Sequence, residues 1–207
     1  MKRPGLLLKR AFDLSVAALA LLVLAFPMAV IAAMIKLTSH GHVLFRQQRP
    51  GFQGRPFTIL KFRTMTAACD AKGNLLPDGK RLTRVGRFLR GTSLDELPEL
   101  VNVLRGDMSL VGPRPLLMQY MTRYTAEQNR RHEVNPGITG WAQVNGRNAL
   151  TWEEKFRLDV WYADNWSLAL DFKILWMTLL KVFTREGISA DGHATMPEFR
   201  GSGPTQG

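Results

Sequence analysis

Two adjacent acids, Asp95 and Glu96, stand in the segment TSLDELPELVNVLRGDMSLVGPRP, residues 92–115. Neighbouring residues on a helix point about 100° apart, so these two carboxylates are not expected to share one proton. A pair of glycosidase carboxylates must flank a bond at roughly 5 to 9.5 Å and rarely comes from adjacent residues. The pair therefore suits unequal roles, in which one acid attacks or is attacked and the other orients a metal ion or a proton.

The residues around the acid pair predict an amphipathic helix. Its apolar positions recur at spacings of three, four and three: Leu94, Leu97, Val101 and Leu104. Ser93 and Glu96 form a possible capping box, whereas Pro98 is better tolerated if the helix begins nearer Asp95. Either start places both acids at the opening turn, where the helix dipole stabilises negative charge by roughly 0.3–1 kcal/mol. We expect both carboxylates to be ionised at neutral pH, and the simplest alternative is that they only begin a helix.

Arg114 offers a counter-charge to these acids. It lies between Pro113 and Pro115, which restrict its backbone, so its guanidinium loses little entropy on binding a ligand. A fixed guanidinium suits bidentate contacts to phosphate oxygens. Attack by a carboxylate on a phosphate needs a divalent cation and arginines to neutralise those oxygens. The acid pair and Arg114 together indicate chemistry at a phosphate.

The composition allows one ordinary domain with an appendage, since 45% of the 207 residues are hydrophobic. Twenty-eight Lys and Arg against seventeen Asp and Glu give a formal charge of +11. This charge favours an anionic partner, which can be phospholipid, a phosphorylated substrate or nucleic acid. The single cysteine, Cys69, excludes an internal disulfide framework and suits a reducing compartment.

The appendage is the segment 14–35, whose 22 residues carry no formal charge and would form a helix of roughly 33 Å. It is too long for a typical signal peptide. Its basic flanks are equal: Lys2, Arg3, Lys9 and Arg10 before it, then Lys36, Arg46, Arg49 and Arg55 after it. A spanning helix usually shows a charge bias, and Pro27 would kink the segment as a re-entrant helix requires. The residues alone leave the spanning and re-entrant interpretations equally supported.

The remaining segments predict a mixture of elements. Residues 57–65 are the best strand candidate, after short extended pieces interrupted at Pro50 and Gly54. Residues 69–80 form a loop, and the phosphate-loop fingerprints are absent from the sequence. Thr151 and Glu154 form a capping box that begins a helix. Arginines recur every third residue over a broad basic face suited to lipid or phosphorylated substrate: Arg81, Arg84, Arg87 and Arg90.

The last long apolar segment, residues 170–187, is interrupted by a polar stripe: Asp171, Thr178, Lys181 and Arg185. Its apolar runs are too short to span a bilayer, so it packs into the core or lies in the membrane interface. Nearby indoles favour the interface: Trp161, Trp166 and Trp176. Residues 201–207 are expected to be disordered.

Four blocks, LFRQQRPG, FTILKFRTM, RVGRFLRGTSLDELPELVNVLRGDMSLVGPRP and PGITGWAQVNGRN, resemble the bacterial sugar transferase family, the monotopic phosphoglycosyl transferases. The resemblance extends from the basic N-terminal helix to about residue 199. The closing GHATMPEFRG is most similar to small members that handle N-acetylated amino sugars, such as the diacetylbacillosamine phosphate transferases.

The resemblance implies a helix-dominated α+β fold with few short strands and amphipathic interfacial helices. Residues 1–36 would form a re-entrant membrane helix broken at Pro27, 37–200 a compact catalytic domain and 201–207 a tail. The family transfers a sugar 1-phosphate from a UDP-sugar to polyprenol phosphate, releasing UMP, at the cytoplasmic face of the bacterial inner membrane. The expected partners are these substrates and membrane lipid, with no nucleic acid.

The resemblance also assigns roles to residues. Asp95 would attack the β-phosphorus and hold the phosphosugar covalently in a ping-pong mechanism. Glu96 would assist through Mg²⁺ or proton handling, with both acids as metal ligands. Substrate phosphate would contact three basic residues, Arg114, Lys61 and Arg87, while Asp159 matches an auxiliary acidic position.

Two alternatives to this transferase are a conventional glycosyltransferase, which would release UDP, and a basic membrane-anchored adaptor without enzymatic activity. The adaptor would tolerate Asp95→Asn. The sequence indicates neither the sugar nor the oligomeric state.

Overall fold

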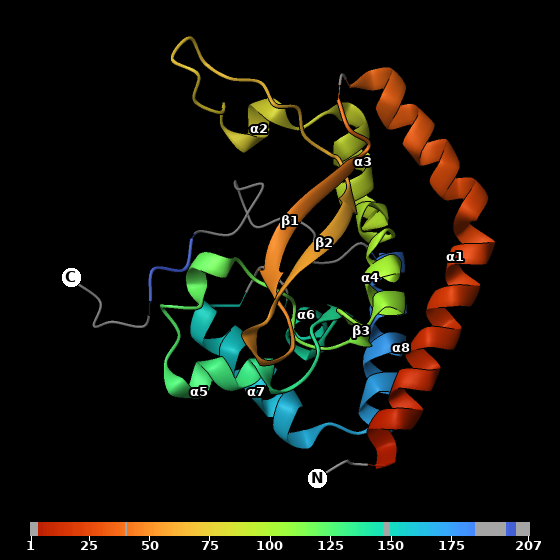
Figure 1. Ribbon diagram of the computed structural model, residues 1–207, viewed down its shortest axis with the longest axis vertical. Helices are drawn as coiled ribbons and strands as arrows, with labels where there is room; N and C mark the ends of the chain where they lie inside the picture. The colour runs from red at the N-terminus through yellow and green to blue at the C-terminus, as the bar shows by residue number, and fades with distance from the viewer. Residues whose placement is uncertain (1–3, 40, 147–149, 185–197, 202–207) are drawn as a thin grey trace.

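The computed structural model describes residues 4–39, 41–146, 150–184 and 198–201. Helices dominate this part of the chain, and two small sheets complete a helix-dominated α+β fold, as predicted (Figure 1). The expected disordered tail after Gly201 and most of the GHATMPEFRG segment lie outside the described residues. The helices are α1 (Pro4–Thr38), α2 (Asp78–Arg81), α3 (Arg84–Thr92), α4 (Glu99–Arg105), α5 (Ala126–Asn129), α6 (Trp141–Val144), α7 (Trp152–Asn165) and α8 (Leu168–Thr184). Short 3₁₀ turns are η1 (Phe52–Gly54), η2 (Leu94–Glu96), η3 (Met118–Tyr120) and η4 (Arg130–Glu133).

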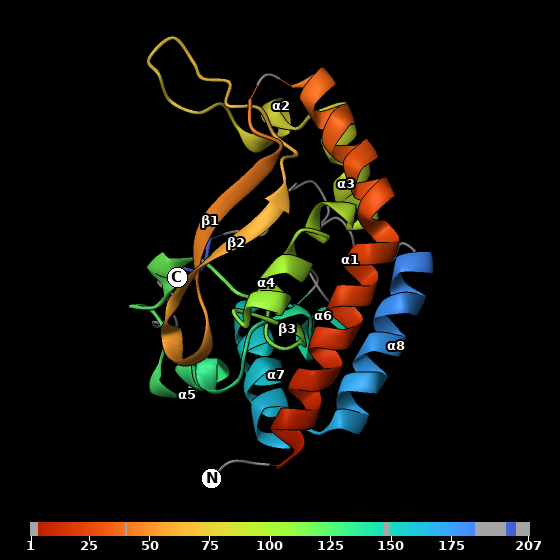
Figure 2. The ribbon, with the colours of Figure 1, turned by 45° about the vertical axis from the view of Figure 1, so that its right-hand side comes forward.

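Helix α1 is the longest element and runs along one side of the molecule (Figures 1 and 2). It continues through Pro27, so the proline does not end the helix. Gly5–Thr38 is long and apolar enough to cross a membrane, and little of its most apolar stretch is buried in the fold. Many of its large apolar side chains are therefore exposed, including those of Leu22 and Phe26.

Both ends of α1 nevertheless pack on the rest of the fold. Near the N-terminus, Ala17 is fully buried in the main hydrophobic core. Near the C-terminus, Ile31 and Ile35 form a second cluster with Phe62 and Leu89. The two ends of the apolar helix thus contact one and the same folded unit.

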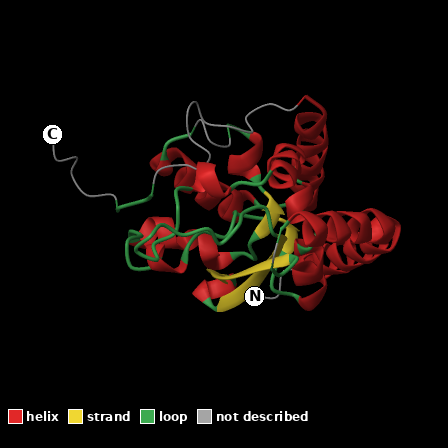
Figure 3. Ribbon diagram, turned by 90° about the horizontal axis from the view of Figure 1, so that it is seen from above, coloured by secondary structure: helices red, strands yellow, loops and turns green. Residues whose placement is uncertain are grey.

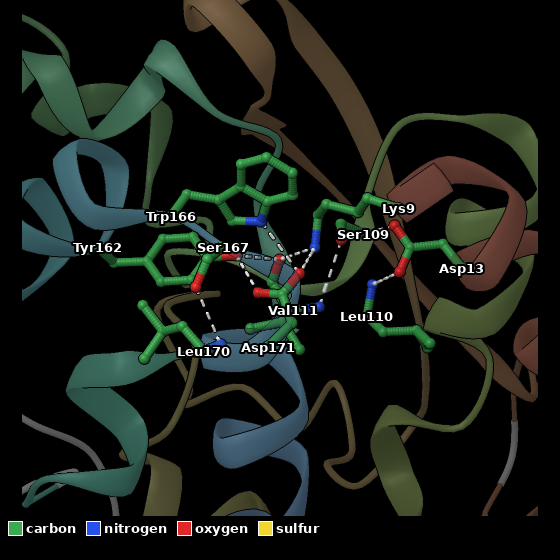
Figure 4. Close-up of polar contacts among 10 residues, drawn as sticks. All are labelled: Lys9, Asp13, Ser109, Leu110, Val111, Tyr162, Trp166, Ser167, Leu170 and Asp171. Atoms are coloured by element: carbon green, nitrogen blue, oxygen red, sulfur yellow. Dashed lines mark hydrogen bonds and ion pairs between the residues drawn. The ribbon is translucent and has the colours of Figure 1, made fainter. Parts of the chain in front are cut away.

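A buried polar network fixes the N-terminal end of α1 (Figure 4). Lys9 Nζ lies 2.6 Å from Asp171 Oδ2 and donates to the carbonyl of Val111 at 3.1 Å. Asp171 also accepts hydrogen bonds from the Tyr162 hydroxyl at 2.7 Å and from Trp166 Nε1 at 3.1 Å. Because buried carboxylates need partners, this network selects one docking position for α1 against α7 and α8.

The strand prediction at residues 57–65 is confirmed in its core. Strands β1 (Leu44–Pro50) and β2 (Pro56–Phe62) pair antiparallel around η1. Asn102 of α4 is fully buried; its side chain accepts from the backbone of Leu60 at 3.0 Å and donates to the carbonyl of Thr58 at 2.7 Å. These bonds hold α4 against β2 and so place Lys61 beside the acids that precede and begin α4.

The second sheet positions the GPRP segment. Strands β3 (Ser109–Val111) and β4 (Gly137–Thr139) pair in parallel. A Cβ at Gly112 would lie 2.2 Å from the Asn135 carbonyl, and one at Gly137 would lie 2.0 Å from the Gly112 nitrogen. Only glycine permits this close approach of the two strands. After β3 the chain continues through Gly112 and Pro113 to Arg114, whose side chain contacts Glu96 of the acid pair. Seen from above, helices lie on both sides of the strands, and most loops lie on one side (Figure 3).

In the two C-terminal helices, the structure confirms the predicted capping box of α7 and shows which way the polar stripe of α8 faces. Thr151 and Glu154 make both bonds of the box at the start of α7. In α8, Asp171 is buried, while the outward face exposes large apolar side chains: Phe172, Trp176, Leu179 and Leu180. The described part of the polar stripe, Asp171, Thr178 and Lys181, therefore faces the rest of the fold, while the apolar face is exposed, the reverse of a helix on a water-exposed surface; Arg185 lies outside the described residues.

Candidate active site

The acid pair lies in a turn between two helices. Ser93 ends α3 in the left-handed conformation with φ 56°, η2 follows, and α4 begins at Glu99 after Pro98. The predicted Ser93–Glu96 capping box is wrong, because an N-cap residue needs extended backbone angles and the Ser93 side chain makes no cap hydrogen bond. Pro98 suits the first turn since its missing N–H would have no partner there.

Glu96 is held by two cations. Its Oε1 accepts from Lys61 Nζ at 2.7 Å and from Arg114 Nη2 at 2.5 Å. Burial raises the pKa of Glu96, but Arg114 and Lys61 outweigh burial and hold this pKa well below its usual range. The structure thus brings together three predicted site residues, and Glu96 is ionised as expected.

Asp95 has the opposite environment. It is 9% exposed, and its carboxylate takes part in no hydrogen bond or ion pair within the described chain. Burial, with a further contribution from the Glu96 charge, raises the pKa of Asp95; Lys61, Arg114 and Arg90 oppose this shift. The pKa values of the two acids are therefore shifted in opposite directions. This differs from the prediction that the helix dipole stabilises the negative charge of both acids alike.

Glu99 is a third acid that the sequence reasoning did not single out. It is 1% exposed, and Lys61 Nζ lies 2.9 Å from its Oε1, although no aligned hydrogen bond from the described residues reaches this oxygen. Burial raises the pKa of Glu99 to about 7, against the opposing effect of Lys61. Its position three residues after Glu96, on the same side of a helical turn, was the available signal.

The arginine row of α3 divides into two sides. Arg90 is partly buried, donates from Nε to Thr64 Oγ1 at 3.1 Å and acts electrostatically on Asp95. Arg87 is exposed on the same helix. The three-residue spacing identified the basic face, but Arg90 is the arginine turned toward the acids, and a phosphate contact by Arg87 stays a prediction.

Asp159 lies deep in α7, away from the solvent. It is 4% exposed and pairs with Arg131, whose Nη2 and Nε lie 2.7 and 3.0 Å from Asp159 Oδ2. Burial raises the pKa of Asp159 and Arg131 opposes this rise. Arg131 also donates to the backbone carbonyl of Arg114 at 2.7 Å. Arg131 was missed because no sequence pattern relates a residue of η4 to a helix that begins about twenty residues later.

A cavity of about 140 Å³ opens beside the acid pair. Glu96 lies on its wall, Lys181 of α8 on another, and the sheet residue Thr139 hydrogen bonds to Thr178 along it at 2.7 Å. Its remaining lining residues are Ser93, Leu97, Leu100, Ile138, Gln143 and Val144. Glu96 thus borders this space, whereas Asp95 is not one of its lining residues.

The acid pair offers oxygen ligands of the type that Mg²⁺ prefers. Among the described residues, no group of three or more His, Cys, Asp or Glu is arranged to hold a metal ion. Mg²⁺ usually needs only one or two carboxylates together with substrate phosphates. Asp95 has its oxygens uncommitted, whereas Oε1 of Glu96 is already bound by two cations. The donor set fits Mg²⁺ when a phosphate supplies further ligands.

Comparison with known proteins gives a consistent result. The sequence model of the family described as "Bacterial sugar transferase" matches residues 5–185. The chain is 57% identical over 198 residues to "Uncharacterized sugar transferase EpsL" of Bacillus subtilis (strain 168), covering 96% of this chain and 98% of that protein.

Longer relatives also match. The "UDP-glucose:undecaprenyl-phosphate glucose-1-phosphate transferase" of Escherichia coli (strain K12) is 42% identical over 190 residues, covering 87% of this chain and 41% of that protein. The "Undecaprenyl-phosphate galactose phosphotransferase" of Salmonella typhimurium is 37% identical over 203 residues, covering 90% and 42%. The chain spans nearly all of the Bacillus protein but about two fifths of these two.

Proposed function

Because this chain belongs to the bacterial sugar transferase family, we propose that it transfers a sugar 1-phosphate from a UDP-sugar to undecaprenyl phosphate and releases UMP. The names of the longer relatives support this type of reaction. The observation on this chain that carries the proposal is the unequal acid pair: a buried Asp95, whose carboxylate has no hydrogen bond from the described residues, stands beside Glu96, which Lys61 and Arg114 hold.

Asp95 is the nucleophile in this proposal. One carboxylate oxygen attacks the β-phosphorus, the bond from that phosphorus to the bridging oxygen breaks, and UMP leaves with the electron pair. The sugar phosphate is then bound covalently to Asp95. A phosphate oxygen of undecaprenyl phosphate next attacks the same phosphorus and releases the Asp95 carboxylate. Glu96 is less suited to attack, since two cations stabilise its negative charge.

The basic residues neutralise the substrate in this scheme. Arg114 and Lys61 contact phosphate oxygens beside the acids, and Arg87 binds phosphate from the outer part of α3. Asp95 and Glu96 are the residues that would hold Mg²⁺, and a bound Mg²⁺ would neutralise phosphate oxygens and so lower the repulsion of an attacking carboxylate. The positions of Lys61 and Arg114, both on Glu96, support the proposed phosphate contacts, because they concentrate positive charge beside the acids.

We place the chain at the cytoplasmic face of the inner membrane, with α1 in the membrane and both of its ends on the cytoplasmic side. Because the helix is continuous through Pro27, its return would take place by a bend at this proline and not by a break. Three features support this topology: both ends of α1 pack on one folded unit, its basic flanks are equal, and α8 exposes an apolar face beside it. Single cysteines placed near each end of the chain test it in sealed vesicles. Labelling of both from the same side is expected, and labelling from opposite sides would exclude the re-entrant helix.

The donor that we propose is a UDP-linked N-acetylated amino sugar, on the strength of the C-terminal GHATMPEFRG alone. A panel of UDP-sugars that includes UDP-glucose and UDP-galactose, with undecaprenyl phosphate and Mg²⁺, tests donor and reaction together. UMP release with one donor supports the transferase. UDP as the only nucleotide product would instead identify a conventional glycosyltransferase, and no product from any donor would favour a binding adaptor.

A further inference from the structure

We propose that Arg131 and Asp159 form a buried positioning device that fixes Arg114 at the acid pair; the inference rests on the proposed function. Neither residue lines the cavity beside Glu96. Both act through the backbone of Arg114, so they are positioning residues and not catalytic ones.

The contacts form one continuous path to the acid pair. Asp159 Oδ2 binds Arg131 at 2.7 and 3.0 Å, and Arg131 Nη2 donates to the Arg114 carbonyl at 2.7 Å. On the other side of the same residue, Arg114 Nη2 contacts Glu96 at 2.5 Å. Arg131 therefore holds the backbone of the residue whose side chain holds Glu96.

The Arg131–Asp159 pair is buried, whereas the Arg114 side chain that it positions is accessible. Side-chain exposure is 2% for Arg131 and 5% for Asp159, against 43% for Arg114. The rings of Tyr124 and Phe156 lie 5.9 and 5.8 Å from the Arg131 guanidinium carbon. Packing on these sides leaves the guanidinium few alternative positions, so the tether to Arg114 is well defined.

The ion pair explains how a buried arginine is tolerated at this place. Without Asp159, the Arg131 that binds the Arg114 carbonyl would be a buried charge without a counter-charge. It would also lie near Arg114, which is itself a cation. Asp159 neutralises Arg131, so the tether adds no net charge beside the acids. The Pro113 carbonyl accepts a hydrogen bond from the Gly137 N–H at 3.1 Å, which ties the start of the loop to β4, and Arg131 supplies the contact at the Arg114 carbonyl itself.

In the wild type Nη2 of Arg131 contacts both the Arg114 carbonyl and Asp159, while Nε contacts Asp159 alone. Arg131→Lys separates the tether from the ion pair, because the lysine chain ends one bond short of Nη2: its ammonium keeps the charge opposite Asp159 and loses the reach to the Arg114 carbonyl. The matched control is Arg130→Lys, the preceding residue, whose partners are the exposed acids Glu127, Glu133 and Asp164.

The experiment measures UMP release by purified full-length enzyme in rapid mixing with saturating UDP-sugar and no acceptor. We expect Arg131→Lys to slow the rate constant by about 10- to 100-fold, as a misplaced binding group does. The amount of UMP released per enzyme in the first turnover should stay at the wild-type value. Arg130→Lys should keep both the rate constant and the amount.

Two results would overturn this inference without affecting the proposed function. One is a wild-type rate constant in Arg131→Lys. The other is a reduced amount of UMP in the first turnover at an unchanged rate constant, which indicates partial unfolding and a merely structural role. The double variant Arg131→Met, Asp159→Leu guards against a folding failure, since apolar pairs commonly replace buried ion pairs without loss of stability. It should show the same slow rate constant. A wild type that releases no UMP overturns the proposed function, and this inference with it.

Discussion

Glu99→Gln should make the protein more stable than wild type at neutral and alkaline pH. The wild-type carboxyl is almost completely buried and its pKa is raised to about 7 from an ordinary value of 4.5. The folded state therefore binds this proton more tightly than the unfolded chain does. The stability associated with the protonated group is complete below about pH 4.5 and is lost as the pH rises through about 7.

The magnitude follows from the pKa difference. A shift of about 2.5 pKa units corresponds to a cost of about 3 kcal/mol once Glu99 is ionised. At about pH 5 most of this cost is absent, so the gap between Glu99→Gln and wild type should widen by about 2.5 kcal/mol between about pH 5 and about pH 9. For a chain of this size the change amounts to about 5–10 °C in melting temperature.

The assay is thermal unfolding of both proteins in the same detergent, followed by tryptophan fluorescence across this pH range. Glu153→Gln, at an exposed position in the first turn of α7, is the control for the same chemical change. The control reports the effect of the same substitution without burial of the side chain. A difference between Glu99→Gln and wild type that stays constant from about pH 5 to about pH 9 would refute the claim that Glu99 carries a raised pKa.

Three further predictions concern the contacts around the site and the membrane face. Lys61→Met removes the cation shared by two acids, so we expect a loss of about 3 kcal/mol, seen as a lower melting temperature and partly recovered in the double variant with Glu99→Gln. Asp171→Asn leaves the Lys9 ammonium without its carboxylate and should make the N-terminal part of α1 more sensitive to limited proteolysis; wild-type sensitivity would contradict the docking role of the network. Trp176 is 62% exposed on α8, so an environment-sensitive dye on Trp176→Cys, with the natural cysteine replaced, should shift to shorter wavelength in vesicles, whereas an unshifted dye would exclude the interfacial position.

Local patterns predicted much of the fold. The capping box at Thr151 and the strand containing Lys61 depend on residues close together in the sequence, and both were found. The inward polar stripe of α8 was visible as a stripe, but its direction was not. Asp171 faces inward because Lys9, far away in the chain, supplies its counter-charge.

The candidate site was predictable where its residues lie close together in the sequence. Asp95, Glu96 and Arg114 lie in one block, and the structure joins Glu96 to Arg114 directly. The Ser93 capping box failed because the left-handed end of α3 takes that residue out of the N-cap conformation. Arg131 could not be found locally, since its role depends on contacts to a loop and a helix that only the folded chain brings together.

The central claim is tested most directly by looking for the covalent phosphosugar on Asp95. The purified enzyme is mixed with UDP-sugar and Mg²⁺ without acceptor, quenched, digested and analysed by mass spectrometry. We expect one sugar phosphate on the peptide containing Asp95, its loss when undecaprenyl phosphate is added before quenching, and no adduct in Asp95→Asn. An Asp95→Asn variant that transfers sugar phosphate at the wild-type rate would contradict the account.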